Sequence, residues 1–371
     1  MKKKVFLRAY CHSNLGDDLF IHILCKRYPD VDFYISMKYE AERGLKDIPN
    51  LHVIHRRRIQ KALDKAGKIV LKKPILTNLI VKKCDAVVMI GGSMFIEDET
   101  GAWRNRLREL QNLRKQTKHF FILGANFGAY HTEEFRQLHA DFFASCDDIC
   151  FRDYWSERLF GEQNNIRYAP DIVFCLEDVF SQKTNKEKRL TVIPIQLKQR
   201  SALREFTEEY SSKMAEVVDS ALSQGWEISF LSFCEEQGDE QAIRDILDKL
   251  PSWKSKKIRC LSYNSNIREV LMEISRSELV ITSRFHGMIL GWVYDANVCP
   301  VIYDHKMSHI IEDIGFQGPI KYVSELNQIS PNDILYIDEK VDVNYLKHEA
   351  QKHFAKIDLY LREGKDDGTK E

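Results

Sequence analysis

The sequence predicts an α/β protein made of two domains, each built on a parallel sheet. Short apolar runs alternate with helical patterns along the whole chain, which is typical of βαβ units. One polar segment, residues 181–189, interrupts the alternation and contains no apolar residue, as expected of an interdomain linker. With 371 residues, the chain is long enough for two domains of ordinary size. We therefore expect domains at 1–180 and 190–335, with 336–371 forming a C-terminal helix and tail.

The apolar runs of the first domain have strand length, and amphipathic or polar segments of helical length separate them. The run at 86–90 ends in a pair of glycines, and the one at 119–123 also ends at a glycine. We predict strands at 5–9, 32–36, 51–55, 86–90, 119–123 and 148–151, and helices at 17–27, 104–116 and 133–144.

The same alternation begins again after the linker. We predict strands at 190–195, 227–233, 258–261, 279–281 and 299–303, and helices at 204–223, 237–250, 267–274 and 288–293. In the C-terminal segment, one apolar face of a helix is marked by Leu346, Ala350, Phe354, Ile357 and Leu361. The carboxyl ends of the strands in each sheet should line a cleft between the domains.

The composition excludes several classes of protein. Lysine plus arginine and aspartate plus glutamate balance at 55 each, so no global charge favours nucleic acid. No apolar run approaches the roughly 18 residues of a membrane span. Nine cysteines without a Cys-x-x-Cys pair are typical of reduced thiols in a cytoplasmic protein. Cys146 and Cys150 lack a second pair, so we expect buried thiols and no metal site.

The most informative motif is Ser283-Arg284-Phe285-His286-Gly287, which lies between a predicted strand and a predicted helix. Ligands collect at the carboxyl ends of strands in open α/β sheets. Arginine offers a fork of donors suited to phosphate and carboxylate, and histidine carries a proton near neutral pH. Lys306 follows the next predicted strand. In isolation, His286 could be a structural histidine that is hydrogen-bonded at the start of a helix. Lys306 could likewise be a solvent-exposed lysine of a helix.

Three more polar clusters follow predicted strands. Asn14, Gly16, Asp17 and Asp18 could receive an anion at a helix start, or could only cap that helix. Gly91-Gly92-Ser93 could be a phosphate-tolerant turn or a tight turn.

Arg152 could bind an anion, or pair with Asp153 or Asp171 at the surface. Arg152, Arg284, His286 and Lys306 all fall at strand ends expected to line the cleft. Considered together, they favour a site for an anionic ligand.

These motifs, in this order, resemble the polysaccharide pyruvyl transferases. The resemblance runs from about residue 3 to 315 through Asn14-Leu15-Gly16-Asp17-Asp18, Gly91-Gly92-Ser93-Met94-Phe95, Phe151-Arg152-Asp153, Ala169-Pro170-Asp171, Gly238-Asp239, Ser283-Arg284-Phe285-His286-Gly287 and Asp304-His305-Lys306. It implies two Rossmann-like domains facing a cleft, as in GT-B glycosyltransferases. It also implies transfer of the enolpyruvyl part of phosphoenolpyruvate to two hydroxyls of one sugar, which makes a cyclic pyruvate ketal.

The resemblance also suggests residue roles. Arg152, Ser283, Arg284 and Lys306 would bind phosphoenolpyruvate, with His286 and Arg284 catalytic. Asp17 or Asp171 could move a second proton, and the acceptor or cleft set would be Asn14, Asp17, Asp18, Gly91, Gly92 and Asp171. Phosphoenolpyruvate is a co-substrate, and we expect no cofactor or metal. This chain departs from the family pattern at Cys11-His12-Ser13, Phe285 and 124–130, so the acceptor and its hydroxyls stay open.

Residues 56–83 hold ten lysines and arginines and one acidic residue, Asp64, with apolar residues at helical spacing. Such a segment could lie on an anionic membrane surface, or be a solvated basic face. The first alternative suits a lipid-linked acceptor at the cytoplasmic side of the membrane. Two other functions stay open: a GT-B glycosyltransferase using a nucleotide-sugar donor, and a non-catalytic binding protein. The oligomeric state is not predicted.

Overall fold

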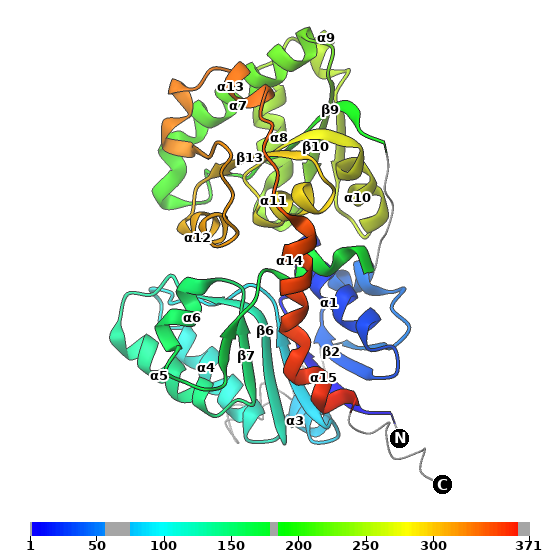
Figure 1. The fold of residues 1–371 in the computed structure, drawn as a ribbon, viewed down its shortest axis with the longest axis vertical. Coiled ribbons are helices and arrows are strands. Elements are labelled where there is room, and N and C mark those ends of the chain that lie inside the picture. Colours follow the sequence, from blue (N-terminus) through cyan, green and yellow to red (C-terminus); the bar gives the residue numbers. More distant parts are fainter. Residues whose placement is uncertain (1, 56–74, 179–184, 363–371) are drawn as a thin grey trace. The chain divides into compact units, whose positions relative to one another are not determined.

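The computed structural model describes residues 2–55, 75–178 and 185–362, which form two compact units (Figure 1). Unit 1 comprises Met1–Cys11, Phe20–Ile172 and His348–Glu371, and unit 2 comprises His12–Leu19 and Val173–Lys347. The units meet in sequence at residues 172 and 173, close to the predicted linker. A short N-terminal segment belongs to unit 2, and the chain from His348 onward belongs to unit 1.

Unit 1 contains an eight-stranded sheet whose paired strands are all parallel. The strand order is β3-β2-β1-β4-β6-β7-β8, with β5 paired to β6. The strands are β1 (Lys4–Arg8), β2 (Asp32–Met37), β3 (Leu51–His55), β4 (Ala86–Ile90), β5 (Ser93–Phe95), β6 (His119–Phe127), β7 (Asp148–Phe151) and β8 (Ile166–Tyr168).

Helices connect these strands, as βαβ units require. The α-helices of this part of the chain are α1 (Leu15–Arg27), α3 (Ile75–Val81), α4 (Trp103–Arg114), α5 (Glu133–Ala144) and α6 (Tyr154–Phe160), with 3₁₀ turns η1 (Tyr39–Leu45) and η2 (Ile172–Asp178). At the C-terminus, α14 (Val343–Ala350), η6 (Gln351–Phe354) and α15 (Ala355–Arg362) follow one another. The predicted apolar face of this segment, from Leu346 to Leu361, is confirmed because all five of its residues are buried.

Unit 2 has a six-stranded parallel sheet in the order β11-β10-β9-β12-β13-β14. Its strands are β9 (Glu187–Ile193), β10 (Glu227–Ser232), β11 (Arg259–Ser262), β12 (Ser277–Thr282), β13 (Asn297–Ile302) and β14 (Lys321–Tyr322). Its helices are η3 (Ser201–Phe206), α7 (Thr207–Ser223), η4 (Glu235–Gln237), α8 (Asp239–Leu247), α9 (Ser252–Ser255), α10 (Ile267–Arg276), α11 (Phe285–Val293), α12 (His305–Asp313), η5 (Val323–Gln328) and α13 (Asn332–Leu335).

Both sheets have the strand order of a dinucleotide-binding Rossmann fold. The order reverses between β1 and β4 in unit 1, and between β9 and β12 in unit 2. Ligands of such sheets bind at this point, outside the carboxyl ends of the strands. Gly91-Gly92 follows β4, and Ser283-Arg284 follows β12, so the fold places both motifs at a switch point.

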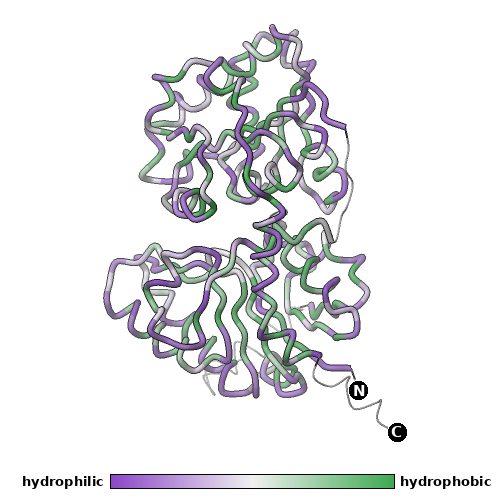
Figure 2. Tube along the Cα trace, viewed as in Figure 1, coloured by the Kyte–Doolittle hydropathy of each residue, from purple (hydrophilic) through white to green (hydrophobic). Residues whose placement is uncertain are grey.

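The predicted fold class is confirmed, and the core explains why so many strands could be predicted from apolar runs. Every residue of β4 and β7 is buried, as in sheets covered on both faces by helices. Hydrophobic residues are concentrated in the strands of both units (Figure 2). All nine cysteines are free thiols, and Cys146 and Cys150 are buried, as predicted.

Some predicted boundaries were wrong. Strand β9 begins at Glu187, inside the segment predicted as a linker, and β6 continues past Gly124 to Phe127. The sequence prediction also missed the short strands β5, β8 and β14. Most of the basic segment 56–83 lies outside the described residues, because the structure describes only 75–83 of it.

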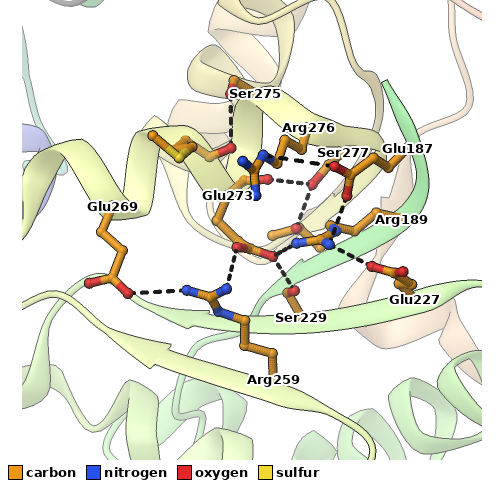
Figure 3. A network of polar contacts seen from close by, with 12 residues as sticks. Glu187, Arg189, Glu227, Ser229, Arg259, Glu269, Glu273, Ser275, Arg276 and Ser277 are labelled. Atoms are coloured by element: carbon orange, nitrogen blue, oxygen red, sulfur yellow. Dashed lines mark hydrogen bonds and ion pairs between the residues drawn. The ribbon is translucent and has the colours of Figure 1, made fainter. Parts of the chain in front are cut away.

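The charged start of β9 is explained by a polar network at the amino ends of four neighbouring strands (Figure 3). Buried Glu273 of α10 accepts from Arg189 of β9 and Ser229 of β10, and lies 3.5 Å from the guanidinium of Arg259. Arg189 also pairs with Glu187 at 2.7 Å and with a glutamate of β10. Charged residues can therefore begin a strand here, since they pair with one another at the edge opposite the carboxyl ends.

Candidate functional site

In unit 2, the segment 12–19 lies against the start of α11. The imidazole of His286 occupies the space that a Cβ on Gly16 would need. Only glycine permits this approach, because any side chain at position 16 would collide with the imidazole. Asn14 holds the turn by accepting from the backbone N–H of Gly16 at 3.0 Å, and the backbone N–H of Leu15 donates to Phe233. Two predicted motifs from opposite ends of the chain therefore meet in one unit.

Arg284 is buried and held by the loop that follows β10. Its guanidinium donates to the carboxylate of Asp239 and to the side-chain oxygen of Gln237. Burial opposes the charge, but Asp239 outweighs this effect and keeps the pKa of Arg284 above its ordinary value. Asp239 also accepts from the backbone N–H groups of Phe233 and Cys234, both at 3.0 Å. Among the residues that the structure describes, Arg284 Nε is buried and has no hydrogen-bond partner.

The backbone before Arg284 is fixed by hydroxyl groups. Thr282 accepts from the backbone N–H of Arg284 at 2.9 Å and donates to its carbonyl at 3.0 Å. The hydroxyls of Ser283 and Tyr210 are 2.9 Å apart, and the N–H of Ser283 donates to Ile193 of β9. Arg284 and His286 are therefore presented from a turn that the strand ends hold in place.

Asp18 is a buried carboxyl near the start of α1. Tyr263, after β11, donates to Asp18 Oδ2 at 2.5 Å, whereas Asp18 Oδ1 is buried without a hydrogen-bond partner in the described part of the chain. Burial raises the pKa of Asp18 to about 7; the Tyr263 hydrogen bond lowers it, and neighbouring Asp17 raises it. Asp18 is therefore not simply a charge that complements the helix dipole, which was the alternative interpretation of this cluster.

A second polar cluster lies at the carboxyl edge of the sheet in unit 1. Arg152, after β7, donates to Asp171 at 3.0 Å and to Asn126 Oδ1 at 2.8 Å. Gly92 lies against this guanidinium, which is 2.5 Å from the place of a Cβ. Ser93 donates to the same oxygen of Asn126 at 3.1 Å. Arg152 does pair with Asp171, but the pair is buried and not at the surface.

The C-terminal segment holds the loop that carries Asp171. His353 of η6 lies 2.8 Å from the carbonyl of Pro170 and is completely buried. Burial lowers the pKa of His353 to about 3, so the ring is neutral at pH 7. Arg167 of β8 pairs with Asp148 and donates to the carbonyl of His353 at 2.9 Å. The C-terminus is thus part of the structure that supports the Arg152 cluster.

The structure divides the predicted site residues between the two units. Lys306 lies in the first turn of α12, which follows β13, the strand beside β12, but its side chain lies outside the described parts. Asp239 was part of the predicted motif set, but its pairing with Arg284 was not predicted. The sequence did not predict that Tyr263, Gln237 and Asn126 contribute to these clusters. Each of them contacts a residue that is distant in the sequence, so no local pattern marks it. Unit 2 holds Asn14, Asp17, Asp18, Ser283, Arg284 and His286, and unit 1 holds Gly91, Gly92, Arg152 and Asp171.

Residues 2–55, 75–178 and 185–362 contain no group of three or more histidine, cysteine, aspartate or glutamate side chains arranged to hold a metal ion. Within the same ranges, no helix combines the length and apolar character that crossing a membrane requires.

The fold and the strand-end sites define a protein of two Rossmann-like units, similar in structure to enzymes of the GT-B fold. Staphylococcus aureus MnaA in a UDP co-structure matches with a TM-score of 0.61 at 10% identity, covering 98% of this chain and 97% of that one. UDP-N-acetylglucosamine 2-epimerase from Rickettsia bellii has a TM-score of 0.58 at 11% identity, covering 98% and 97%. UDP-GlcNAc 2-epimerase from Methanocaldococcus jannaschii, in complex with UDP-GlcNAc and UDP, has a TM-score of 0.57 at 13% identity. The match covers 97% of this chain and 100% of that one.

The family is shown by sequence. The polysaccharide pyruvyl transferase family model matches residues 14–305, which is most of the chain and includes every predicted site residue except Lys306, which directly follows the match. The chain belongs to the polysaccharide pyruvyl transferase family. This membership places it among the transferases of polysaccharide biosynthesis, with a polysaccharide or sugar as acceptor.

Proposed function

We propose that the protein transfers the enolpyruvyl part of phosphoenolpyruvate to two hydroxyls of one sugar, in a surface polysaccharide or its lipid-linked precursor. The product is a cyclic pyruvate ketal, and phosphate is released. The observation that carries this proposal is the contact between Gly16 and His286, beside the buried Arg284. It brings a proton carrier and an anion-binding group to one switch point of a protein in this family.

The reaction needs two proton movements and one leaving group. A proton reaches the methylene carbon of phosphoenolpyruvate, so that C2 becomes electrophilic and the first sugar hydroxyl adds to it. The C–O bond to phosphate breaks, and the second hydroxyl forms the second C–O bond. Protonation turns the methylene carbon into a methyl group, and the two sugar hydroxyls each lose a proton. One of these protons balances the proton taken up by the methyl group, and the other is carried away by the released phosphate. Proton transfer by a positioned side chain typically contributes a factor of about 10²–10⁴ to such a step.

In this proposal His286 carries a proton, and Arg284 binds an anionic group of the donor. Arg284 is well suited because its charge is maintained by Asp239 and its Nε is a buried donor with no partner among the described residues. Lys306 would add a second cation from the neighbouring strand end, and Ser283 a hydroxyl. Arg152 of unit 1 is proposed as a further donor ligand.

The acceptor contacts are proposed to come from the remaining predicted residues. Asp17 and Asp171 are candidates for the second proton transfer. We also propose that no cofactor takes part, since phosphoenolpyruvate brings the group that is transferred. The acceptor or cleft set is Asn14, Asp17, Asp18, Gly91, Gly92 and Asp171.

The test is release of inorganic phosphate from phosphoenolpyruvate, measured with a panel of sugar and lipid-linked oligosaccharide acceptors. We expect acceptor-dependent release by the unaltered protein. We expect His286→Ala to lower the rate by at least about a hundredfold while it still binds phosphoenolpyruvate. Near-full activity of His286→Ala would exclude its role. Turnover of a UDP-sugar without phosphoenolpyruvate would instead indicate a nucleotide-sugar glycosyltransferase.

We propose, separately, that residues 56–83 bind an anionic membrane surface at the cytoplasmic side, where a lipid-linked acceptor would lie. The proposal rests on the ten basic residues of this segment. Flotation with vesicles of phosphatidylcholine alone and with added phosphatidylglycerol is the test. Binding to the anionic vesicles only would support the proposal, and absence of binding to both would exclude it.

A further inference from the structure

Four aromatic side chains lie at the carboxyl ends of three neighbouring strands of unit 1. Tyr130 follows β6, Tyr154 and Trp155 begin α6 after β7, and Tyr168 ends β8. We call these four residues the aromatic platform. Tyr154 is 39% exposed and Trp155 is 37% exposed, although they are large rings next to each other in the chain. Adjacent exposed aromatic residues at a ligand-binding edge of a sheet indicate a binding surface.

Packing and hydrogen bonds hold the platform in place. The rings of Tyr154 and Tyr168 stack with centroids 3.6 Å apart and an angle of 27° between their planes. The ring of Trp155 lies 3.4 Å from the place of a Cβ on Gly128, and 6.1 Å from the ring of Tyr130. These rings are therefore fixed before any ligand arrives, which lowers the entropy cost of binding.

The helix that carries the platform is anchored through buried polar groups. Asp153 caps α6 by accepting from the N–H of Ser156 at 2.7 Å, and the hydroxyl of Ser156 donates back to it at 2.9 Å. The same hydroxyl accepts from the N–H of Phe127 in β6 at 2.7 Å. The position of Trp155 is thereby tied to two strands of the sheet.

A buried donor in the same region has no partner. Asn126 of β6 is 4% exposed, and its Nδ2 makes no hydrogen bond to any residue that the structure describes. Its Oδ1 accepts from both Arg152 and Ser93, and a flipped amide would turn its NH₂ group toward the guanidinium of Arg152, which can only donate. A buried donor of this kind needs an acceptor, and a hydroxyl oxygen of a ligand can supply one.

We propose that the aromatic platform is the acceptor subsite, where a pyranose ring stacks on Trp155 and Tyr154. A pyranose has an apolar face of C–H groups and a rim of hydroxyls, so it matches flat aromatic rings beside polar groups. This inference rests on the proposed function, since it takes its occupant from the sugar acceptor. It assigns acceptor recognition to α6 and to the ends of β6 and β8, and not to the glycine motifs alone.

Tryptophan fluorescence tests binding without any turnover. Of the five tryptophans, Trp103, Trp226 and Trp292 are buried, and only Trp155 and Trp253 are exposed. In a Trp253→Phe protein, a change in fluorescence on adding methyl glycosides of galactose, glucose, mannose or N-acetylglucosamine therefore reports on Trp155. We expect a saturable change with at least one glycoside, and its loss in Trp253→Phe/Trp155→Ala. No saturable change with any of the four would overturn the proposal.

Kinetics give a second, independent test. Trp155→Ala should raise the KM for the acceptor about tenfold or more, with the KM for phosphoenolpyruvate unchanged and kcat within about threefold. Trp155→Tyr should restore most of the loss because it keeps a flat ring. Trp253→Ala is the matched control, since Trp253 is 60% exposed in α9 of unit 2. An unchanged acceptor KM in Trp155→Ala, with the same melting temperature as the unaltered protein, would overturn the proposal.

The two proposals fail in different ways. If the unaltered protein releases no phosphate from phosphoenolpyruvate with any acceptor, the proposed function is wrong, and the fluorescence titration still decides the platform. If phosphate is released normally but neither titration nor KM depends on Trp155, the platform is wrong and the proposed function stands.

Discussion

The imidazole of His286 fills the space that a side chain on Gly16 would need. These residues begin two different helices, α1 and α11, and belong to the same compact unit. The glycine is therefore explained by the position of a histidine far away in the sequence, and not by the turn in which it lies.

This contact predicts the behaviour of Gly16→Ala. The added Cβ must displace the His286 ring, so we expect a loss of stability of about 1–3 kcal/mol from overpacking. We also expect turnover to fall by about a hundredfold, if His286 transfers a proton. Chemical denaturation and phosphate release measure the two effects. Gly161→Ala is the control, because its Cβ would come no closer than 3.4 Å to another atom.

A double-mutant cycle separates the contact from the chemistry. In a His286→Ala background the collision is gone, so Gly16→Ala should then cost little stability. If Gly16→Ala cost the same with and without His286, the two residues would not be in contact in solution.

We predict that the buried side chains of Arg284 and Asp239 stabilise the fold only as a pair. Arg284→Gln leaves the buried carboxylate of Asp239 without its cation, and should destabilise the protein by about 3–5 kcal/mol. Adding Asp239→Asn removes this charge and lets the two amides bond, so stability should return while phosphoenolpyruvate turnover stays lost. Denaturant titration and phosphate release are the measurements. Recovery of turnover in the double variant would show that the Arg284 charge is not needed for catalysis.

The raised pKa of the buried Asp18 carboxyl leads us to expect that the stability of the protein depends on pH. The pKa of this carboxyl is raised in the folded state to about 7, from 3.8. Because the unfolded state loses the proton first, the free energy of unfolding falls as pH rises from about 4 to about 7, by on the order of 4 kcal/mol in total. Asp18→Asn removes this dependence and can still accept from Tyr263.

The measurement compares the unaltered protein with Asp18→Asn by denaturant titration. Between about pH 5 and about pH 8, the variant should gain about 3 kcal/mol relative to the unaltered protein. A constant difference across this range would mean that Asp18 has an ordinary pKa. Asp338→Asn is a suitable control, because it also removes one carboxylate but Asp338 is exposed.

The network around Glu273 is predicted to stabilise unit 2 without acting on the candidate site. Glu273→Ala leaves Arg189 and Ser229 without a shared buried acceptor, and should cost about 3 kcal/mol of stability. The network lies at the amino ends of the strands, so the KM for phosphoenolpyruvate should stay the same. Glu269→Ala, which removes an exposed partner of Arg259, should cost less than about 1 kcal/mol. A large change in KM for Glu273→Ala would contradict this separation.

The sequence alone was sufficient for the fold class and for most strands. A strand covered by helices on both faces must be apolar along its length, so β4 and β7 could be predicted directly. Short or charged strands could not, because β5, β8 and the start of β9 carry little apolar signal. The ends of the strands followed from the same apolar runs. With them followed the carboxyl edge of each sheet, where Arg284 and His286 lie in unit 2 and Arg152 lies in unit 1.

Only the tertiary structure decided which partners these residues take. Nothing local indicates that Arg284 pairs with Asp239, that Tyr263 bonds to Asp18, or that Asn126 receives Arg152. Each contact joins segments at or just after the carboxyl ends of different strands, and the strand order brings those segments together. Apolar periodicity is a property of neighbouring residues and can be seen along a chain, whereas a buried polar contact depends on where distant segments meet. The sequence therefore determined the sheets and the strand ends that carry the candidate residues, and the fold determined which of those residues pair.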